Sequence, residues 1–545
     1  MKVILSIFSL LFLFTMAHSC SDTRREADLI VSNAIIYTVD NEFSVAQSMA
    51  VGNDKILAVG SNEEIRKQFK SKQMVDAGGK PIYPGFIDAH SHFIGYAIGL
   101  QMAILNGLNS FEEVIEALKT HEINYSGEWL VGRGWDQNRW PGKEFPSNKL
   151  LDQAFPTTPV VLVRVDGHAV IVNNEAMQRL GINEATKFPD GEAIYKKNEL
   201  IGVFLESIAD RFKAAIPPLA KTDLVKLLLR AQKNCVSVGL TSVCDAGLSR
   251  ERVLMLDSLH KSGELALRIY AMLDPSEENI EYFVRKGIYK TDRLSVRSIK
   301  LYADGALGSR GARLIEPYSD APGQYGLWVH SPDEMQLISR LALDNGYQVC
   351  IHCIGDAAVR RVLNIYSEFL PENNDLRWRI EHVQVVHPED FDVFKKYNIV
   401  PSIQSTHATS DMYWAGSRVG EHRLQYAYAQ QRLLAQNGWL PNGTDFPIEG
   451  ISPINTFYAA VARKDLSGFP EGGFQSNDAL SREQALRSIT IWAAKAAFEE
   501  NEKGSLEPGK FADFVILDQD LMTVAEEKIP LTKALSTWIG GKQVY

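Results

Sequence analysis

The feature that most constrains the fold is an alternation of apolar segments with amphipathic stretches through the middle of this 545-residue chain. Short apolar strands separated by helices are typical of βα units on a parallel sheet. Eight segments have this strand character: Tyr83–His92, Leu240–Ala246, Ala266–Leu273, Val296–Asp304, Tyr347–Ile354, Trp378–Gln384, Ile399–Ser405 and Trp439–Asp445. Eight parallel strands predict an α/β fold of the (β/α)8 TIM barrel type. An open doubly wound sheet is the alternative, and no G-x-G-x-x-G follows a strand to favour it.

The spacing of the strands predicts further domains. The gap between the first two strands is too long for one crossover connection, so we expect residues 105–235 to form an α/β insertion that covers the active site. Short β segments lie at both ends, in residues 28–82 and 500–545, and each end alone has too few strands to be stable. We therefore expect one small β-sandwich domain built from both ends. Residues 83–104 and 236–499 remain for the barrel.

The N-terminal residues 1–19 are typical of a secretory signal peptide. A positive residue, Lys2, precedes an apolar run that is shorter than the ~20 residues of a membrane span. Small residues precede Cys20 and a polar tether follows it to residue 27, which resembles the lipid-attachment site of bacterial lipoproteins. We expect an exported protein, in the periplasm or at the cell surface, that is anchored to a membrane through lipidated Cys20. A plain signal peptide with an incidental cysteine is the alternative.

Charge and cysteine content limit the classes of partner. The chain has 57 basic and 67 acidic residues and a formal net charge of −10, so nucleic acid is not an expected partner. A small-molecule substrate is expected, and oligomerisation is left open. The cysteines are too few for a disulfide scaffold. Cys350 and Cys353 form a C-x-x-C, but i and i+3 point to opposite faces of a strand, so we expect them to pack in the core.

Side chains that bind metals follow several predicted strands. His90 and His92 lie at i and i+2 near the end of the first strand, so both imidazoles leave the same face and can meet one ion. Hydrogen-bonded or surface histidines are the alternative for this pair taken alone. His352, His382 and Asp445 each lie near the C-terminal end of another strand, where barrels assemble their active sites. This convergence predicts a metal centre with one or two divalent ions, and Zn²⁺ is the expected metal.

These motifs together resemble the amidohydrolase superfamily, and in particular its YtcJ-like branch of metal-dependent hydrolases, amidohydrolase family 3. The resemblance runs from about Asp28 to the C-terminus. It is carried by PGFIDAHSHF at 84–93, SIKLYADGALGSRGA at 298–312, GWDQNRW at 134–140, RVDGHAVIVN at 164–173 and the terminal LEPGKFADFVILD.

The resemblance implies a set of metal ligands. It makes His90 and His92 ligands of one ion, and His352 and His382 ligands of a second. Lys300 would bridge the two ions after carboxylation by CO2, because a lysine ammonium has no lone pair to offer a metal. The alternative is an unmodified Lys300 whose charge is neutralised by Asp304, with a single ion bound.

The resemblance also implies a reaction. A metal-activated hydroxide would attack a carbonyl carbon and hydrolyse a C–N bond other than a peptide bond, in an amide such as an N-substituted formamide or an N-acyl compound. Asp445 would contact the first metal, take the proton of the nucleophile and pass it to the leaving nitrogen. An N-cap of the following helix is the alternative role for Asp445. A lyase or isomerase on the same barrel, and a catalytically inactive surface binding protein, are the alternative functions.

Two groups of residues are candidates for substrate contact. Asp304, Ser309 and Arg310 lie on a glycine-rich loop beyond Lys300, where hydrogen bonds that stabilise the loop are the alternative. His407 follows the seventh strand closely enough to remain a candidate, although a surface or loop position is favoured.

The insertion supplies the second group. Trp135 and Trp140 are expected to form part of an aromatic wall over the site with Asp136 beside them, although an insertion of this size also needs a core of its own. His168 is expected in the same cleft, and its alternative is a structural histidine bonded to Asp166.

Overall fold

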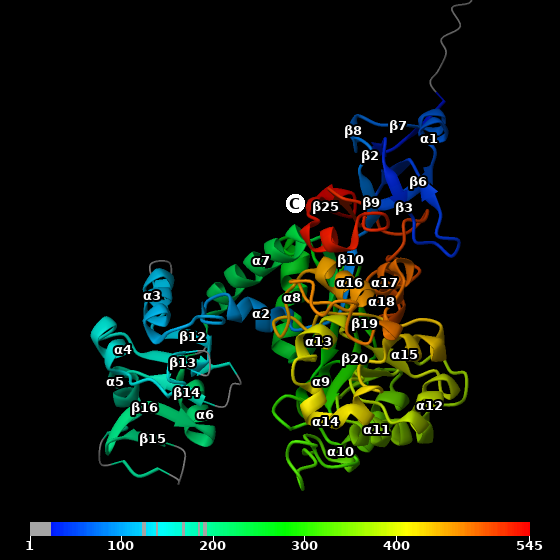
Figure 1. Ribbon diagram of the computed structural model, residues 1–545. Coiled ribbons are helices and arrows are strands. Elements are labelled where there is room, and N and C mark those ends of the chain that lie inside the picture. Colours follow the sequence, from blue (N-terminus) through cyan, green and yellow to red (C-terminus); the bar gives the residue numbers. More distant parts are fainter. Residues whose placement is uncertain are drawn as a thin grey trace, which may run out of the picture.

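The computed structural model describes residues 23–122, 127–137, 140–165, 169–183, 186–188, 193–217 and 219–545. It consists of a barrel, an insertion beside the barrel and a β domain, as Figure 1 shows. The predicted lipidation site Cys20 and the candidate substrate residue His168 lie outside the described residues. In the described part of the chain, no helix is both long and apolar enough to cross a membrane.

The barrel is built on a parallel sheet, which confirms the predicted fold class. Within the described residues seven parallel strands follow one another around the sheet: β10 (Phe86–Ser91), β17 (Leu240–Leu248), β18 (Arg268–Leu273), β20 (Leu294–Tyr302), β21 (Gln348–Cys353), β22 (Arg379–His382) and β23 (Val400–Ser402). A short strand, β19 (Tyr289–Lys290), pairs antiparallel with β20. Cys350 and Cys353 are buried free thiols on β21, which confirms that they pack in the core.

The prediction of a regular eighth strand over Trp439–Asp445 is wrong. This segment lies between β23 and β10, but it is joined to β23 by a single parallel bridge, Ile403 to Asn442. On the other side the Asp445 N–H donates to the carbonyl of His90 at 2.7 Å. A left-handed backbone at Asp445, with φ of 59°, ends the extended run. The barrel therefore closes through isolated hydrogen bonds rather than through a ladder.

Helices cover the outside of the barrel. The longer ones are α2 (Phe93–Gly99), α7 (Lys221–Ser237), α8 (Arg250–Ser262), α10 (Pro332–Asp344), α11 (Asp356–Phe369), α13 (Ser405–Asp411), α14 (Ala415–Leu424), α15 (Gln430–Asn437) and α16 (Pro453–Ala462). α11 illustrates why these segments are helical, because Val359, Val362 and Tyr366 recur at helical spacing and are fully buried against the sheet. The main hydrophobic core lies between the strands and these helices.

The insertion has a mixed sheet of its own, which confirms an α/β insertion after strand 1. Its strands follow the order β11 (Ala103–Ile104), β12 (Leu130–Trp135), β13 (Val160–Arg164), β14 (Ala169–Val172), β16 (Glu199–Leu205) and β15 (Ala193–Lys196), with α3 (Phe111–Glu122) and α6 (Glu206–Ala215) beside them. The predicted insertion limits, 105–235, include most of α7, but α7 buries Leu228, Ala231 and Cys235 in the main core of the barrel. α2 and α7 connect the insertion to the barrel (Figure 1). The role of the insertion as a cover over the active site stays a prediction.

Both ends of the chain contribute to the β domain. One sheet has the order β6 (Lys55–Gly60), β5 (Ser48–Gly52), β2 (Leu29–Ser32) and β8 (Gln73–Asp76). The other sheet has the order β26 (Lys542–Gln543), β25 (Ala534–Ile539), β24 (Phe514–Leu517), β9 (Pro81–Pro84), β3 (Ile35–Tyr37) and β4 (Val45–Ala46). The central pair, β24 and β9, joins the two ends of the chain.

A buried ion pair attaches the β domain to the barrel. The guanidinium of Arg268, at the start of β18, donates to both carboxylate oxygens of Asp513, at 2.6 and 2.9 Å. The backbone N–H of Gly540 donates to the same carboxylate at 2.8 Å. Because this contact lies at the N-terminal ends of the barrel strands, the β domain leaves the opposite, C-terminal end of the barrel to the functional residues.

The close approach at the eighth segment yields a prediction. A Cβ added to Gly443 would overlap the backbone nitrogen of His90 and would lie 2.7 Å from Asp88 Oδ1 and 2.9 Å from the His90 carbonyl. We expect Gly443→Ala to lower the free energy of unfolding by about 1–3 kcal/mol, because backbone must move to accept the methyl group. Urea denaturation followed by circular dichroism measures this change.

Gly450→Ala is the matched control. Gly450 is exposed, and an added Cβ there meets no heavy atom within 4 Å. Equal stability of the two variants would contradict the close packing of the eighth segment on β10.

Candidate metal centre

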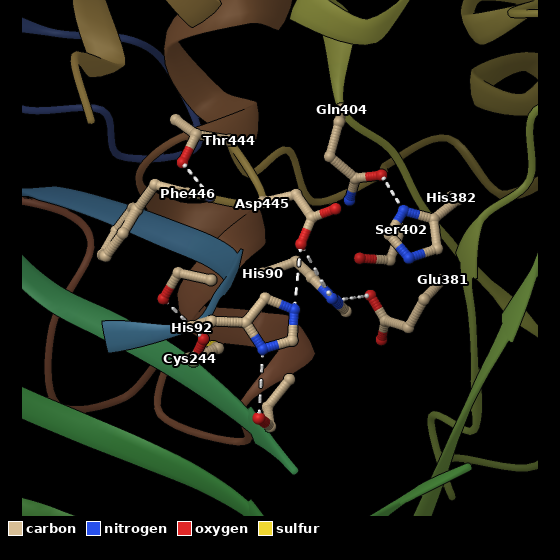
Figure 2. A network of polar contacts seen from close by, with 12 residues as sticks. His90, His92, Cys244, Glu381, His382, Ser402, Gln404, Thr444, Asp445 and Phe446 are labelled. Atoms are coloured by element: carbon tan, nitrogen blue, oxygen red, sulfur yellow. Dashed lines mark hydrogen bonds and ion pairs between the residues drawn. The ribbon is translucent and has the colours of Figure 1, made fainter. Parts of the chain in front are cut away.

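The C-terminal ends of the barrel strands bring the predicted metal ligands together. Two groups within the described residues have ligand atoms close enough to share an ion, namely His90, His92 and Asp445, and His382, His407 and Asp445. Asp445 belongs to both groups, and Figure 2 shows its carboxylate directed towards His90 and His92. His90, His92, His382 and Asp445 thus lie together at the strand ends, and their role as metal ligands stays a prediction.

The first group is compact. His92 Nε2 lies 3.1 Å from Asp445 Oδ1, and His90 Nε2 lies 3.7 Å from the same oxygen. Two ligand atoms that bind one zinc ion at about 2.1 Å with a tetrahedral angle lie about 3.4 Å apart. The observed separations are close to this value.

The second nitrogen of each histidine is held by an acceptor. His90 Nδ1 lies 2.6 Å from Glu381 Oε2, His92 Nδ1 lies 3.3 Å from the carbonyl of Ala246, and His382 Nδ1 lies 2.7 Å from Gln404 Oε1 (Figure 2). Each acceptor requires the proton on Nδ1 and leaves a lone pair on Nε2. The tautomers are therefore those that a metal ligand needs.

Glu381 is a functional residue that the sequence analysis missed. Its carboxylate is fully buried and lies 2.6 Å from Arg379 Nε, while Arg379 also donates to the carbonyl of Ala89 at 2.6 Å and to Ser402 Oγ at 2.8 Å. Burial raises the pKa of Glu381, but the charge of Arg379 and the hydrogen bond from His90 outweigh burial and hold the pKa below its usual range. An ionised Glu381 orients His90. Arg379 and Glu381 lie at i and i+2 in an otherwise apolar strand segment, and this pattern in the sequence could have indicated a buried ion pair.

His407 is the second residue that the structure brings closer to the site than the sequence analysis expected. It lies on α13 with Nε2 at 3.8 Å from Asp445 Oδ2, and Gln384 Nε2 lies 3.0 Å from its Nδ1. The sequence favoured a surface or loop position for His407, but its side chain is buried. The turn from β23 into α13 brings it to the site, and no local pattern in the sequence reveals that turn.

Lys300 lies at the centre of the barrel end. Burial lowers the pKa of its ammonium to about 8, and Nζ lies 3.9 Å from the centre of the Tyr302 ring. The neighbouring carboxylate of Asp304 accepts the backbone N–H groups of Arg313, Ile354 and Gly355 at 2.8–3.0 Å. Asp304 therefore stabilises the loop. Bridging of two ions by Lys300 stays a prediction.

His352 lies beside these groups. Its ring centre is 4.4 Å from that of His382, and its Nε2 is 3.6 Å from Asp304 Oδ1. Burial, followed by the charge of Lys300, lowers the pKa of His352 to about 3, so its imidazole is neutral at pH 7. It stays a predicted ligand, although neither of the two groups of ligand atoms includes it.

The residues fit a divalent metal. Within the described part of this cluster, the buried atoms without a hydrogen-bond partner include His90 Nε2, His352 Nε2, His407 Nε2, Lys300 Nζ and Asp445 Oδ1. A buried polar atom without a partner costs about 1–3 kcal/mol, and several such atoms pointing into one space have a common cause. Imidazole and carboxylate ligands suit several divalent metals, so the donor set indicates a metal site without naming its ion.

The loop residues predicted to bind substrate contact other protein groups. The Arg310 guanidinium donates to both oxygens of Asp320, at 3.1 and 2.9 Å. Ser309 Oγ lies 3.4 Å from the carbonyl of Ala306. These are the loop-stabilising contacts that formed the alternative, and substrate contact by Ser309, Arg310 and Asp304 stays a prediction.

The insertion residues also pack within their own domain. Trp135 is completely buried, donates from its indole nitrogen to the carbonyl of Leu162 at 2.8 Å and stacks on Trp140 at 6.0 Å. Asp136 accepts from Arg164 at 2.8 Å. The two indoles thus form part of the insertion's core, the alternative considered above, and their role in substrate binding stays a prediction.

The contact between Glu381 and His90 yields a prediction. We expect Glu381→Gln to weaken Zn²⁺ binding roughly 10- to 100-fold, because the ion pair with Arg379 that fixes the orientation of His90 is lost. Competition with a chromophoric chelator measures the affinity. Glu389→Gln, at an exposed carboxylate that pairs with Arg360, is the control and should bind Zn²⁺ as the wild type does. Unchanged affinity in a folded Glu381→Gln variant would contradict the assigned role.

Comparison with known proteins agrees with this geometry. The sequence profile described as "Amidohydrolase family" matches residues 73–545. YtcJ of Bacillus subtilis strain 168, named as an amidohydrolase, is 28% identical over 94% of this chain and 98% of its own. The N-substituted formamide deformylase of Arthrobacter pascens is 25% identical over 94% of this chain and 97% of its own.

A solved structure shows the same fold. The crystal structure of an uncharacterised metal-dependent hydrolase from Pyrococcus horikoshii OT3 has a TM-score of 0.78 and 28% identity, and the match covers 91% of this chain and 99% of that one. The resemblance to YtcJ-like amidohydrolases predicted from the sequence is thereby confirmed. The family profile spans far more than half of the chain, and the protein belongs to the amidohydrolase family.

Proposed function

We propose that this hydrolase uses a divalent metal, with Zn²⁺ as the expected ion, to hydrolyse the C–N bond of an amide other than a peptide bond. The substrate class that we propose is N-substituted formamides and related N-acyl compounds. The observation that carries the proposal is the position of Asp445, whose two carboxylate oxygens each lie within 4 Å of a histidine nitrogen that points into the site. The relative from Arthrobacter pascens, named as an N-substituted formamide deformylase, supports this choice of substrate class.

The residues of the chain have separate roles in this reaction. His90 and His92 would hold one metal ion with Asp445, and His382 would hold a second where two ions bind. A bound metal would supply a Lewis acid that polarises a carbonyl and lowers the pKa of water. Burial raises the pKa of Asp445, but the neighbouring imidazoles of His92, His90 and His407 lower it to about 2. Asp445 is therefore ionised at neutral pH and able to accept a proton.

The proton has a defined course. A carboxylate oxygen of Asp445 accepts it from the attacking water as the new C–O bond forms. Asp445 then donates it to the nitrogen of the substrate as the C–N bond breaks, because nitrogen leaves as a neutral amine. The products are a carboxylic acid, which is formate for a formamide, and an amine. One water is consumed, so one ¹⁸O from labelled water enters the acid, which would not occur in a lyase or isomerase reaction.

We propose further that Lys300 carries a carbamate. An uncharged Nζ adds to CO2 and releases one proton, which converts an unpartnered amine into a group with two oxygens. Its complete burial beside the histidines and the absence of a hydrogen-bond partner for Nζ within the described residues support this role.

The role of Asp445 yields a prediction. We expect Asp445→Asn to lower kcat by roughly 10²–10⁴-fold on N-substituted formamides, because the amide cannot accept the proton. Amine release measures the rate, and Zn²⁺ content is measured on the same sample to show that most metal is retained. Asp344→Asn, at an exposed carboxylate on α10, should keep wild-type activity. Turnover that persists in a metal-loaded Asp445→Asn variant would show that another group transfers the proton.

Metal removal yields a second prediction. We expect dialysis against a chelator to abolish activity, and Zn²⁺ or Mn²⁺ to restore it faster with bicarbonate than without, because bicarbonate supplies CO2 for the carbamate. Lys300→Met should lose the dependence on bicarbonate together with most of the activity. Recovery that is independent of bicarbonate in the wild type would contradict the carbamate, and a protein that stays inert after metal and bicarbonate would favour a binding function.

A further inference from the structure

We infer that His407 is a metal ligand, and that His382, His407 and Asp445 form a second ion site next to the site of His90 and His92. The motifs at the strand ends assign the second ion to Lys300, His352 and His382, so His407 adds a position to the metal centre. This inference rests on the proposed metal-dependent hydrolysis.

Distance and burial support the assignment. His407 Nε2 lies 3.8 Å from Asp445 Oδ2, which is too long for a hydrogen bond but close to the separation of about 3.4 Å expected for two ligands of one zinc ion. Only 6% of His407 is exposed, and its Nε2 has no hydrogen-bond partner among the described residues. The ligand atoms of His382, His407 and Asp445 all lie within 4.8 Å of one another.

The environment of the second nitrogen is consistent with this role. Gln384 lies against His407 Nδ1 as Gln404 lies against His382 Nδ1. At Gln384, however, the amide nitrogen faces the ring at 3.0 Å, and Oε1 has no hydrogen-bond partner among the described residues. A half-turn of this amide exchanges its nitrogen and oxygen at nearly constant shape. Oε1 then accepts from Nδ1–H, as at Gln404, and His407 Nε2 presents its lone pair to the ion.

Asp445 connects the two sites. Its Oδ1 faces His90 and His92, and its Oδ2 faces His407. A single carboxylate therefore offers one oxygen to each ion. The pair of sites therefore does not depend on a carbamate. A carbamate on Lys300 would add a bridging group, and two ions should bind even when CO2 is excluded.

The experiment counts bound ions without CO2. The full chain is stripped of metal, dialysed against Co²⁺ in degassed buffer without bicarbonate, and analysed for metal per protein. We expect two equivalents for the wild type and one equivalent for His407→Asn, with the second ion bound at least tenfold more weakly. His422→Asn, at an exposed histidine on α14, is the matched control and should bind two equivalents.

A second variant reports direct contact. His407→Cys places a thiolate at the same position, and we expect a thiolate-to-Co²⁺ charge-transfer band that appears with the second equivalent. This band also decides the question if His407→Asn does not fold, which circular dichroism would reveal. A purely structural role of His407 would produce no such band.

The outcomes are separable. Two equivalents at wild-type affinity in His407→Asn, a single equivalent in the wild type, or a metal-loaded His407→Cys without the band would each overturn the inference. If the wild type binds two ions and His407→Asn binds one, the inference stands even when no amide is hydrolysed, and in that case the proposed function fails alone.

Discussion

The interaction on which the site depends is the buried ion pair of Arg379 and Glu381, which lies on β22 inside the barrel. Burying a carboxylate alone is costly, so Glu381 is tolerated because Arg379 lies 2.6 Å away and because His90 donates to it. Arg379 in turn is held by the carbonyl of Ala89 and by Ser402. One guanidinium therefore connects β10, β22 and β23 beneath the histidines, and it fixes the orientation of His90.

Burial also explains why the ligands stay available to a metal. His90, His382 and His407 each have one ring nitrogen occupied by a side chain from a neighbouring strand or strand end. The free nitrogens face the carboxylate of Asp445, and water is largely excluded. A site of this kind carries an energetic cost in the empty protein that an ion removes, so metal binding and stability are coupled.

The sequence predicts much of this arrangement, and particular residues show why the rest was hidden. His90, His92, His382 and Asp445 follow apolar strands, and in a parallel barrel strand ends converge whatever the details of packing. Contacts such as His90 with Glu381, 291 positions apart in the sequence, depend on which face of each strand points inward. The insertion tryptophans were ambiguous for a similar reason, because a core and an exposed aromatic wall have the same local composition.

The eighth segment, Trp439–Asp445, shows a limit of prediction from sequence, because its backbone conformation does not follow from its pattern of residues. Trp439–Asp445 has the composition of a strand, yet Gly443 lies against the backbone of His90 and Asp445 adopts a left-handed φ of 59°. His382, at the end of β22, has a φ of 74°. A left-handed backbone at a residue other than glycine costs about 1–3 kcal/mol and persists only where surrounding contacts impose it. Here the Asp445 N–H is held by the carbonyl of His90 at 2.7 Å, so the same backbone contact that closes the barrel also turns the Asp445 carboxylate towards the histidines. Closure of the fold and orientation of the Asp445 carboxylate therefore depend on the same backbone contact.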